Sequence, residues 1–198
     1  MIEFRNDSID QPYIDLREYY KDAILKNQSM VEAILIASYD KVKKEVDARY
    51  VNLKIIDNNN FIFFSNYNSP KSKQFSNHRQ ITAILFWSAI NVQIRMKATI
   101  SKLSSDFSDQ YFKKRDPAKN ALAISSRQSE KIKSYSEVEQ NFKKALLSKD
   151  LSVRPEYWGG FSFKPYYFEF WKGDESRVNK RVGYELINDN WQNFFLEP

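Results

Sequence analysis

Alternating apolar and polar residues predict β-strands as the main secondary structure of this chain. Between residues 92 and 103 the apolar positions recur at every second residue: Val92, Ile94, Met96, Ala98 and Ile100. A two-residue period places one set of side chains on one face of a strand. Aromatic and polar residues alternate after Trp158 as well. Shorter apolar runs predict further strands over residues 31–38, 48–57, 61–66 and 81–89.

Helical periodicity is confined to three stretches. Helices are expected over residues 15–26, 106–115 and 127–148, with Asp15, Ser105 and Ser126 as their N-caps. Aspartate and serine suit that position because their side chains accept a hydrogen bond from a free backbone N–H. The first of these helices is amphipathic and is expected to cover a sheet.

The remaining segments are expected to be turns and loops. Residues 57–60 predict the turn of a hairpin, because asparagine tolerates positive φ. Residues 1–12 are polar and are expected to form a loosely held, flexible arm. Residues 66–73 contain Pro70 and predict a loop, and residues 74–80 have no firm period.

The order of these elements predicts the fold class. No repeat, low-complexity tract or long linker interrupts residues 1–198, so one domain is expected. Antiparallel-type strands with few helices predict an α+β domain built on a β-barrel or sandwich with covering helices. The hydrophobic share of 42% and the aromatic share of 16% are enough for a substantial core.

Charge and composition narrow the classes of partner and site. A formal net charge of +6 and a pI near 9.3 favour anionic partners, and nucleic acid, phosphorylated metabolites and acidic lipids all fit. The absence of cysteine from the sequence excludes disulfides and thiolate sites, and a single histidine, His78, argues against a histidine metal site. The longest apolar run, residues 81–87, is too short to span a membrane. A cytoplasmic protein is expected.

The stretch from Trp158 to Arg181 contains the densest candidate chemistry. A glycine pair at 159–160 permits tight backbone geometry, and the aromatic residues that follow form a flat apolar surface. Arg177 and Arg181 are spaced so that both guanidinium groups could line one opening. An aromatic surface beside two planar cations suits a flat, anionic ligand.

Two further segments carry cations and hydroxyls. Arg49 and Lys54 fall on opposite faces of a predicted strand, where they could serve two different anions or simply be solvated. Residues 64–71 offer hydroxyls, loop amides and Lys71, which are common phosphate donors, although many polar loops contain such residues.

Two polar positions lie within regular elements. Gln93 interrupts a β-branched strand, where its amide needs a ligand or a backbone carbonyl as partner. Tyr111 and Arg115 are four residues apart and share one helical face, so they could bind one phosphate or form an ordinary surface pair.

Together these segments resemble the pyridoxine (pyridoxamine) 5'-phosphate oxidase family. The motifs that carry the resemblance are R-x-V-x-L-K at 49–54, F-S-N-x-x-S-P-K at 64–71, Gln93, Y-F-x-x-R at 111–115, S-x-Q-S at 126–129, W-G-G at 158–160, E-F-W-x-G at 169–173, R-x-x-x-R at 177–181, Tyr184 and W-x-x-x-x-L-x-P at 191–198. The resemblance covers residues 49–198 and is most specific at the C-terminal end.

The resemblance implies an FMN-binding split β-barrel that works as a homodimer. Two flavin sites would lie at the interface, and residues 158–198 would form the dimerisation and active-site strands. FMN would accept a hydride from C4' of pyridoxine or pyridoxamine 5'-phosphate. Molecular oxygen would then reoxidise the flavin, giving pyridoxal 5'-phosphate and hydrogen peroxide. No metal, nucleic acid or membrane is implied.

The resemblance also assigns roles to individual residues. The cofactor-binding residues would be Arg49, Lys54, Ser65, Lys71, Gln93, Gln128, Ser129, Trp171 and Arg181. The substrate-binding residues would be Lys54, Tyr111, Arg115, Lys119, Arg177 and Asn179. Arg177 and Asn179 would act on the reacting ring and are the candidate catalytic residues.

Several positions depart from the family pattern, and two alternatives stay open. The departures are Phe64 in place of Tyr, Pro70 and Val92 in place of basic residues, Lys119 in place of Ser, and Asn179-Lys180 in place of His-Asp. One alternative, favoured by Lys119, Asn179 and Lys180, is a related FMN enzyme that oxidises another flat substrate, as in the phenazine pathway. The other is a basic β-barrel that is not an enzyme and binds nucleic acid through stacked aromatic side chains.

Overall fold

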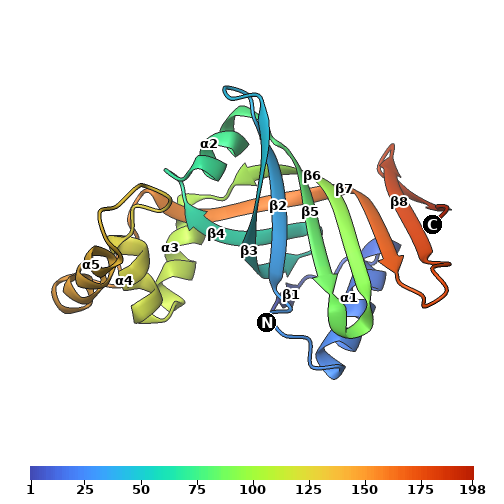
Figure 1. The fold of residues 1–198 in the computed structure, drawn as a ribbon, viewed down its shortest axis with the longest axis horizontal. Coiled ribbons are helices and arrows are strands. Elements are labelled where there is room, and N and C mark those ends of the chain that lie inside the picture. Colours follow the sequence, from blue (N-terminus) through green and yellow to red (C-terminus); the bar gives the residue numbers. More distant parts are fainter.

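The predicted strands form one sheet that curls into a barrel (Figure 1). The computed structural model describes residues 1–198, apart from the side chain of Ser148. Its strands are β1 (Glu3–Arg5), β2 (Ala33–Asp40), β3 (Glu45–Asp57), β4 (Asn60–Asn66), β5 (Gln80–Trp87), β6 (Val92–Lys102), β7 (Trp158–Lys172), β8 (Lys180–Ile187) and β9 (Asn190–Phe195). Its helices are α1 (Gln11–Leu25), α2 (Pro70–Asn77), α3 (Ser105–Lys114), α4 (Pro117–Ser125) and α5 (Tyr135–Ser148), with a short 3-10 turn η1 (Ser88–Ile90).

The barrel closes because β4 pairs with both β3 and β7. Going round the ring, the order is β3, β2, β5, β6, β7 and β4, and the pairings are antiparallel. The hairpin expected at 57–60 is present, with Asn58 in the left-handed region at φ 53°. The α+β split-barrel prediction is therefore confirmed. None of the helices in the described part of the chain is both long and apolar enough to cross a membrane.

Strand β7 changes partner halfway along its length. Its first half pairs with β4 up to Phe163, and its second half pairs with β8 from Tyr167 onwards. A register shift against β6 leaves Tyr166 as an extra residue between these halves. Proline is tolerated at such a break in a ladder because it has no N–H to donate, and Pro165 stands there.

The extra residue reverses the alternation of β7. Before the shift, Phe161 and Phe163 point into the core, whereas after it Phe168 and Phe170 do so. Glu169 and Trp171 therefore face the opposite side of the sheet. The bulge decides which aromatic side chains fill the barrel and which remain outside it.

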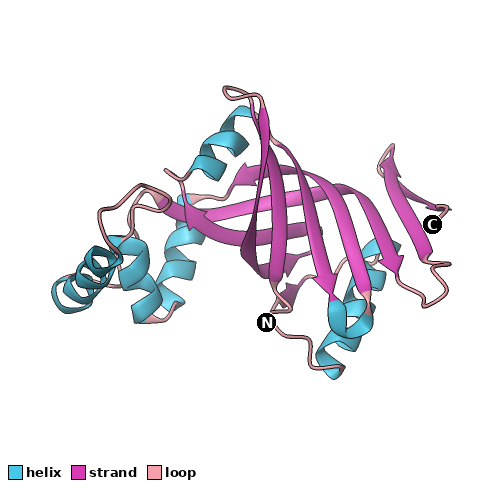
Figure 2. Ribbon diagram, viewed as in Figure 1, coloured by secondary structure: helices cyan, strands magenta, loops and turns pink.

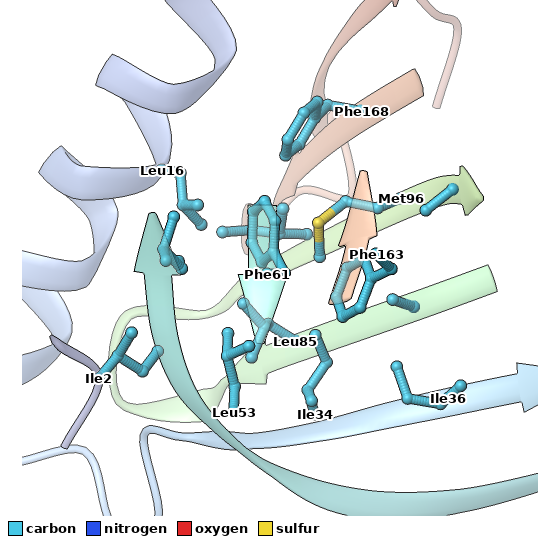
Figure 3. Packing of buried hydrophobic residues seen from close by; sticks show 14 of the residues in the cluster. Ile2, Leu16, Ile34, Ile36, Leu53, Phe61, Leu85, Met96, Phe163 and Phe168 are labelled. Carbon is cyan, nitrogen blue, oxygen red and sulfur yellow. The ribbon is translucent and has the colours of Figure 1, made fainter. Parts of the chain in front are cut away.

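The barrel interior is packed with aromatic and aliphatic side chains from every strand of the ring. Figure 3 shows Phe61, Phe163 and Phe168 lying between the strands, and Leu16 of α1 covering one end. The rings of Phe61 and Phe163 stack with centroids 5.0 Å apart. Buried aromatic pairs of this kind add about 0.5–1.5 kcal/mol each beyond their area.

The N-terminal segment differs from the expectation of a loosely held arm. β1 pairs in parallel with β3 at Ile55–Asp57, and Ile2 is buried. Helix α1 begins at Gln11 with Asp10 as its N-cap, four residues before the predicted start at Asp15. Pro12 belongs to its first turn, where a proline loses no helical hydrogen bond.

Two helices are missed by the sequence interpretation because each opens with a proline. The segment around Pro70 was expected as a loop, but it starts α2. Pro117 starts α4, and residues 127–134, expected within a long helix, connect α4 to α5. Ser104, not Ser105, caps α3 and accepts a hydrogen bond from the Phe107 N–H. Figure 2 shows α2, α3, α4 and α5 on the left side of the barrel and α1 at its lower right.

Candidate functional site

A cavity of about 420 Å³ lies where β3 and β4 separate. The β3–β4 pairing starts at Leu53, so residues 45–52 of β3 pair with β2 along one edge and leave the other edge open. Helices α2 and α3 flank this gap (Figure 1). The cavity, called the anion cavity below, is lined by Arg49, Tyr50, Val51, Asn52, Lys54, Phe64, Lys71, Tyr111, Arg115, Gln128, Ser129 and Trp158.

The charge of the anion cavity is positive. Among the described residues that line it, four are cations and none is a carboxylate. The cations are Arg49, Lys54, Lys71 and Arg115. A concave surface that carries one sign of charge concentrates ligands of the opposite sign. The cavity is therefore suited to an anion such as a phosphate.

Lys71 is buried among neutral partners. Helix α2 carries it into the cavity, where it is 7% exposed. Its Nζ donates to Ser69 Oγ at 3.1 Å and to Gln128 Oε1 at 2.9 Å, and Ser65 Oγ donates to the same Gln128 oxygen. Burial, together with the nearby charge of Arg49, lowers the pKa of Lys71 to about 8. A bound anion would relieve both effects.

A second cavity of about 310 Å³ adjoins the first. It shares Asn52, Lys54, Tyr111 and Arg115 with the anion cavity and adds Lys114, Asp116 and Lys119. This second site is called the adjoining cavity. Burial lowers the pKa of Lys54, and the nearby cations Lys119 and Arg115 lower it further, against the opposing charge of Glu32.

Stacked aromatic rings form the wall between the two cavities. Phe64 and Tyr111 stack with centroids 3.7 Å apart, and Phe64 stacks on Trp158 at 5.3 Å. The Arg115 guanidinium lies 4.5 Å from the Trp158 ring centroid and donates to Asn120 Oδ1 at 3.0 Å. Burial lowers the pKa of Arg115 and raises that of Tyr111. The wall holds the cation and the phenol in fixed positions.

The expected separation of Arg49 and Lys54 needs a correction. Strand alternation assigns them to opposite faces, yet both line the anion cavity. The cavity surrounds the open edge of β3, and the register shifts between Leu53 and Ile55 beside Lys54. A strand edge without a neighbour also exposes backbone N–H groups. Both cations can therefore serve one site.

Three predicted residues gather at the other end of β7. Gln93 lies opposite Trp171, and Trp171 lies opposite Arg181. This set is called the C-terminal cluster. Gln93 is half-buried there, in place of the buried amide expected from the sequence. The guanidinium of Arg181 contacts Glu169 Oε1 at 2.7 Å, and its Nη1 donates to the Glu197 carbonyl at 2.6 Å.

A loop before β8 carries the two candidate catalytic residues. Arg177 is exposed and has a left-handed backbone at φ 64°. Asn179 Oδ1 accepts a hydrogen bond from the Asp174 N–H at 3.1 Å, so this side chain closes the loop on itself. The Arg181 guanidinium turns toward Glu169.

The anion cavity and the C-terminal cluster are far apart within one chain. Ser65 lies opposite Gly159 at the start of β7, and Gln93 lies opposite Trp171, twelve residues further on. At about 3.3 Å per residue, this is roughly 40 Å along the strand. Figure 1 shows α2 and α3 toward one end of the long axis and β8 at the other.

An apolar sheet surface lies between the two groups. Cross-strand pairing places Tyr50, Leu35 and Ile84 in one row, and Phe86 pairs with Gln93 of the C-terminal cluster on the same face. Tyr50 is 67% exposed and Phe86 52% exposed. This outer face joins the mouth of the anion cavity, where Tyr50 also lies, to the C-terminal cluster.

Comparison with known protein families identifies the chain. Residues 21–149 match the family model described as "Pyridoxamine 5'-phosphate oxidase". Residues 158–198 match the one described as "Pyridoxine 5'-phosphate oxidase C-terminal dimerisation region". The chain belongs to the pyridoxamine 5'-phosphate oxidase family. It is accordingly an FMN oxidoreductase.

Relatives within this family are similar over most of the chain. The pyridoxine/pyridoxamine 5'-phosphate oxidase of Polynucleobacter asymbioticus is 35% identical over 169 residues, which are 84% of this chain and 79% of that protein. The enzyme of the same name from Pseudomonas putida is 32% identical over 192 residues, which cover 95% and 89% of the two chains.

Solved structures support the same fold. PhzG from Burkholderia lata, in complex with tetrahydrophenazine-1-carboxylic acid, has a TM-score of 0.88 at 21% identity and covers 96% of this chain and 93% of that chain. A pyridoxamine 5'-phosphate oxidase-related, FMN binding protein from Nostoc punctiforme has a TM-score of 0.76 at 14% identity, with 92% and 97% covered. At these levels of sequence identity, the two similarities establish the pyridoxamine 5'-phosphate oxidase fold of this chain.

Some site residues were not predicted from the sequence. Trp158 belongs to the W-G-G motif without an assigned role, and its ring supports Arg115. Glu169 belongs to the E-F-W-x-G motif without an assigned role, and its carboxylate binds Arg181. Gln74 and Ser38 hold Arg49 from neighbouring elements. No local pattern distinguishes such neutral residues, because their partners come from distant parts of the chain.

Proposed function

We propose that this protein oxidises pyridoxine 5'-phosphate or pyridoxamine 5'-phosphate to pyridoxal 5'-phosphate. FMN would supply the hydride acceptor, and molecular oxygen would be reduced to hydrogen peroxide; with the amine substrate, water would also be consumed and ammonia released. The observation that carries the proposal is the pair of neighbouring cationic cavities that share Lys54, Tyr111 and Arg115. A flavin phosphate and a substrate phosphate require two such sites side by side. The names of the family relatives also support this reaction.

The residues of the anion cavity fit the phosphate of FMN. Lys71 is buried, and both of its hydrogen-bond partners are neutral. A phosphate would therefore supply the missing negative charge. Hydroxyl, amide and cationic side chains beside it complete a phosphate site. The residues that would hold the flavin from this side are Arg49, Lys54, Ser65, Lys71, Gln128 and Ser129. When bound, FMN supplies the two-electron acceptor that no side chain can replace.

The adjoining cavity would hold the phosphate of the substrate. Lys54, Tyr111 and Arg115 offer two cations and a phenol, and Lys119 adds a third cation where a hydroxyl was expected. Asp116, the carboxylate among the lining residues, is occupied by the Ala118 and Lys119 N–H groups at the start of α4. Its charge is partly neutralised there, which leaves the cavity positive.

The protein would act as a homodimer whose partner completes each site. Gln93, Trp171 and Arg181 are too distant to reach the anion cavity of their own chain. A two-fold axis through the outer face would bury Tyr50 and Phe86 and bring the C-terminal cluster of one protomer to the cavity of the other. The match of residues 158–198 to a dimerisation region supports this arrangement.

The side chains would then orient both rings and stabilise charge. Gln93 and Arg181 would donate to the polar edge of the flavin, where negative charge develops during hydride transfer. Arg177 would press the substrate ring against the flavin from the opposite side, a proximity effect that can contribute several kcal/mol. Asn179 would keep the loop of Arg177 closed through its bond to Asp174.

An absorbance spectrum and a peroxide assay test this function directly. The purified protein should be yellow or become yellow with FMN, and pyridoxine 5'-phosphate should then release hydrogen peroxide. A flavin-loaded protein without turnover would contradict the oxidase and favour the enzyme with another flat substrate. A colourless protein that ignores FMN but retards single-stranded nucleic acid on a gel would favour the non-enzymatic barrel.

A further inference from the structure

Both terminal nitrogens of the Arg49 guanidinium are engaged in the free protein. Its Nη1 donates to Ser38 Oγ at 2.7 Å and to the Ile36 carbonyl at 3.3 Å. Its Nη2 donates to Gln74 Oε1 at 2.9 Å and to the carboxylate of Asp47. A guanidinium has five N–H donors, and four of them are on these two nitrogens. A bidentate phosphate contact uses at least one N–H of a terminal nitrogen, so the phosphate must take a donor from one of these acceptors.

Of the four acceptors, Asp47 alone carries charge and can move. It lies two residues before Arg49 on β3, so both side chains leave the same face of the strand. Its side chain is 49% exposed, whereas Gln74 and Ser38 are buried. Partial burial raises the pKa of Asp47, but the charge of Arg49 together with hydrogen bonds from Arg49, Gln74 and the backbone lowers the pKa overall, so the carboxylate is ionised at neutral pH.

The other cations of the anion cavity lack such a partner. Among the ion pairs of the described residues, one joins Arg49 to Asp47, and none involves Lys54, Lys71 or Arg115. Asp47 itself does not line the cavity and approaches Arg49 from outside it. The cavity therefore has three cations without a carboxylate partner and one that is held by an internal anion.

We propose that Asp47 competes with the ligand phosphate for Arg49 and thereby lowers the affinity of the anion cavity for phosphate ligands. Its carboxylate holds Arg49 until a phosphate dianion displaces it. A phosphate with two charges binds a guanidinium in bidentate fashion and outcompetes a carboxylate with one. A ligand that ends in a hydroxyl or a single weak charge does not. The inference rests on the proposed function, because it names the FMN phosphate as the displacing group.

The test compares Asp47→Asn with a matched control, Glu45→Gln. Glu45 precedes Asp47 by two residues on β3, but it pairs with Lys43 at 3.5 Å, so the control removes one negative charge without touching Arg49. Flavin fluorescence titration gives the affinities for FMN and for riboflavin, which lacks the phosphate. Asp47→Asn should bind FMN about two- to five-fold more tightly than wild type, the range expected for an exposed ion pair. Its affinity for riboflavin should be unchanged.

Three results would overturn the inference. They are an FMN affinity of Asp47→Asn that equals or falls below wild type, an equal gain in Glu45→Gln, and an equal gain for riboflavin. Inorganic phosphate provides a measurement that needs no flavin. A given rise in melting temperature should require a lower phosphate concentration for Asp47→Asn than for wild type. Failure of wild type to bind FMN would contradict the proposed function, and the phosphate titration would still decide the role of Asp47.

Discussion

The anion cavity and the C-terminal cluster differ in how their cations are neutralised. Among the described residues of the cavity, Arg49 alone of the four cations is paired with a carboxylate, and Lys71 has neutral oxygens as partners. Beside the cluster, Glu169 is 3% exposed and contacts the guanidinium groups of Arg181 and of Arg95 on β6. The first region is thus prepared to receive charge from a ligand, and the second is already balanced. The difference separates a binding region from a structural one that presents donors to a partner.

The largest expected effect is on substrate binding and comes from Arg115→Ala. Loss of a charge-assisted phosphate contact costs about 1.5–3 kcal/mol, so KM for pyridoxine 5'-phosphate should rise by about 10- to 100-fold. Steady-state peroxide release measures this change. Lys113→Ala, an exposed cation on the same helix, is the control and should leave KM within about two-fold. An unchanged KM in Arg115→Ala would remove the substrate from the adjoining cavity.

Removing the negative charge of Glu169 beside the C-terminal cluster should lower the stability of the protein. Glu169→Gln leaves Arg95 and Arg181 without their shared counter-charge, which should lower the free energy of unfolding by about 2–3 kcal/mol. The cost stays at the lower end because both guanidinium groups are partly exposed. Urea denaturation measures it. Glu185→Gln on β8 is exposed and should cost less than about 0.5 kcal/mol. Equal losses in the two variants would refute the role of Glu169.

In the anion cavity, removal of a charge at Lys71 should raise the stability of the protein. Lys71→Met removes a buried charge without a carboxylate partner and should raise the free energy of unfolding by about 1 kcal/mol, while FMN binding is lost. Denaturation and flavin titration of one preparation test both effects. A destabilised Lys71→Met variant would show that the cavity is not prepared for an external charge.

The pH dependence of Lys71 follows from its lowered pKa. Because the folded pKa is about 8 and the ordinary value is 10.5, the folded state binds fewer protons between these values. The stability contribution of Lys71 is therefore present above pH 10.5 and is lost as pH falls to about 8. FMN affinity should instead weaken as pH rises above about 8, because phosphate needs the protonated amine. The Lys71→Met variant should lack the stability slope in a pH titration of unfolding, and the binding slope is measured on wild type.

The smallest expected effect concerns the loop before β8. Asn179→His should raise turnover several-fold, because an imidazole can titrate near neutral pH and can still accept the hydrogen bond from the Asp174 N–H. Turnover under saturating substrate measures it. Asp189→His, in the turn between β8 and β9, controls for an added imidazole elsewhere. An unchanged or lower rate would show that this position does not limit turnover.

Strands were easier to predict from the sequence than helices were. The two-residue period of β6 can be read from consecutive residues, so the strand is predicted without knowledge of what it packs against. Helices α2 and α4 were missed because Pro70 and Pro117 suggest a loop, although proline suits a first turn. Boundaries in such segments depend on what the helix packs against, which local sequence does not contain.

The candidate site was predictable only in part. Lys54, Tyr111 and Arg115 were grouped through the family resemblance, and the cavities contain them together. The distance between these residues and Arg181 was not predictable, because it depends on how β7 exchanges β4 for β8. Asp47 was missed because a carboxylate two residues from an arginine on a strand is common and gives no signal by itself.

The additional residue at Tyr166 determines which face of the sheet each later side chain of β7 occupies. If that residue were deleted, the strand would regain strict alternation, and Trp171 would turn inward while Phe170 turned toward solvent. The first half of the strand, with its glycine pair, would keep its place. One amino acid of chain length therefore determines whether the two ends of a single strand can serve the same ligand from different protomers.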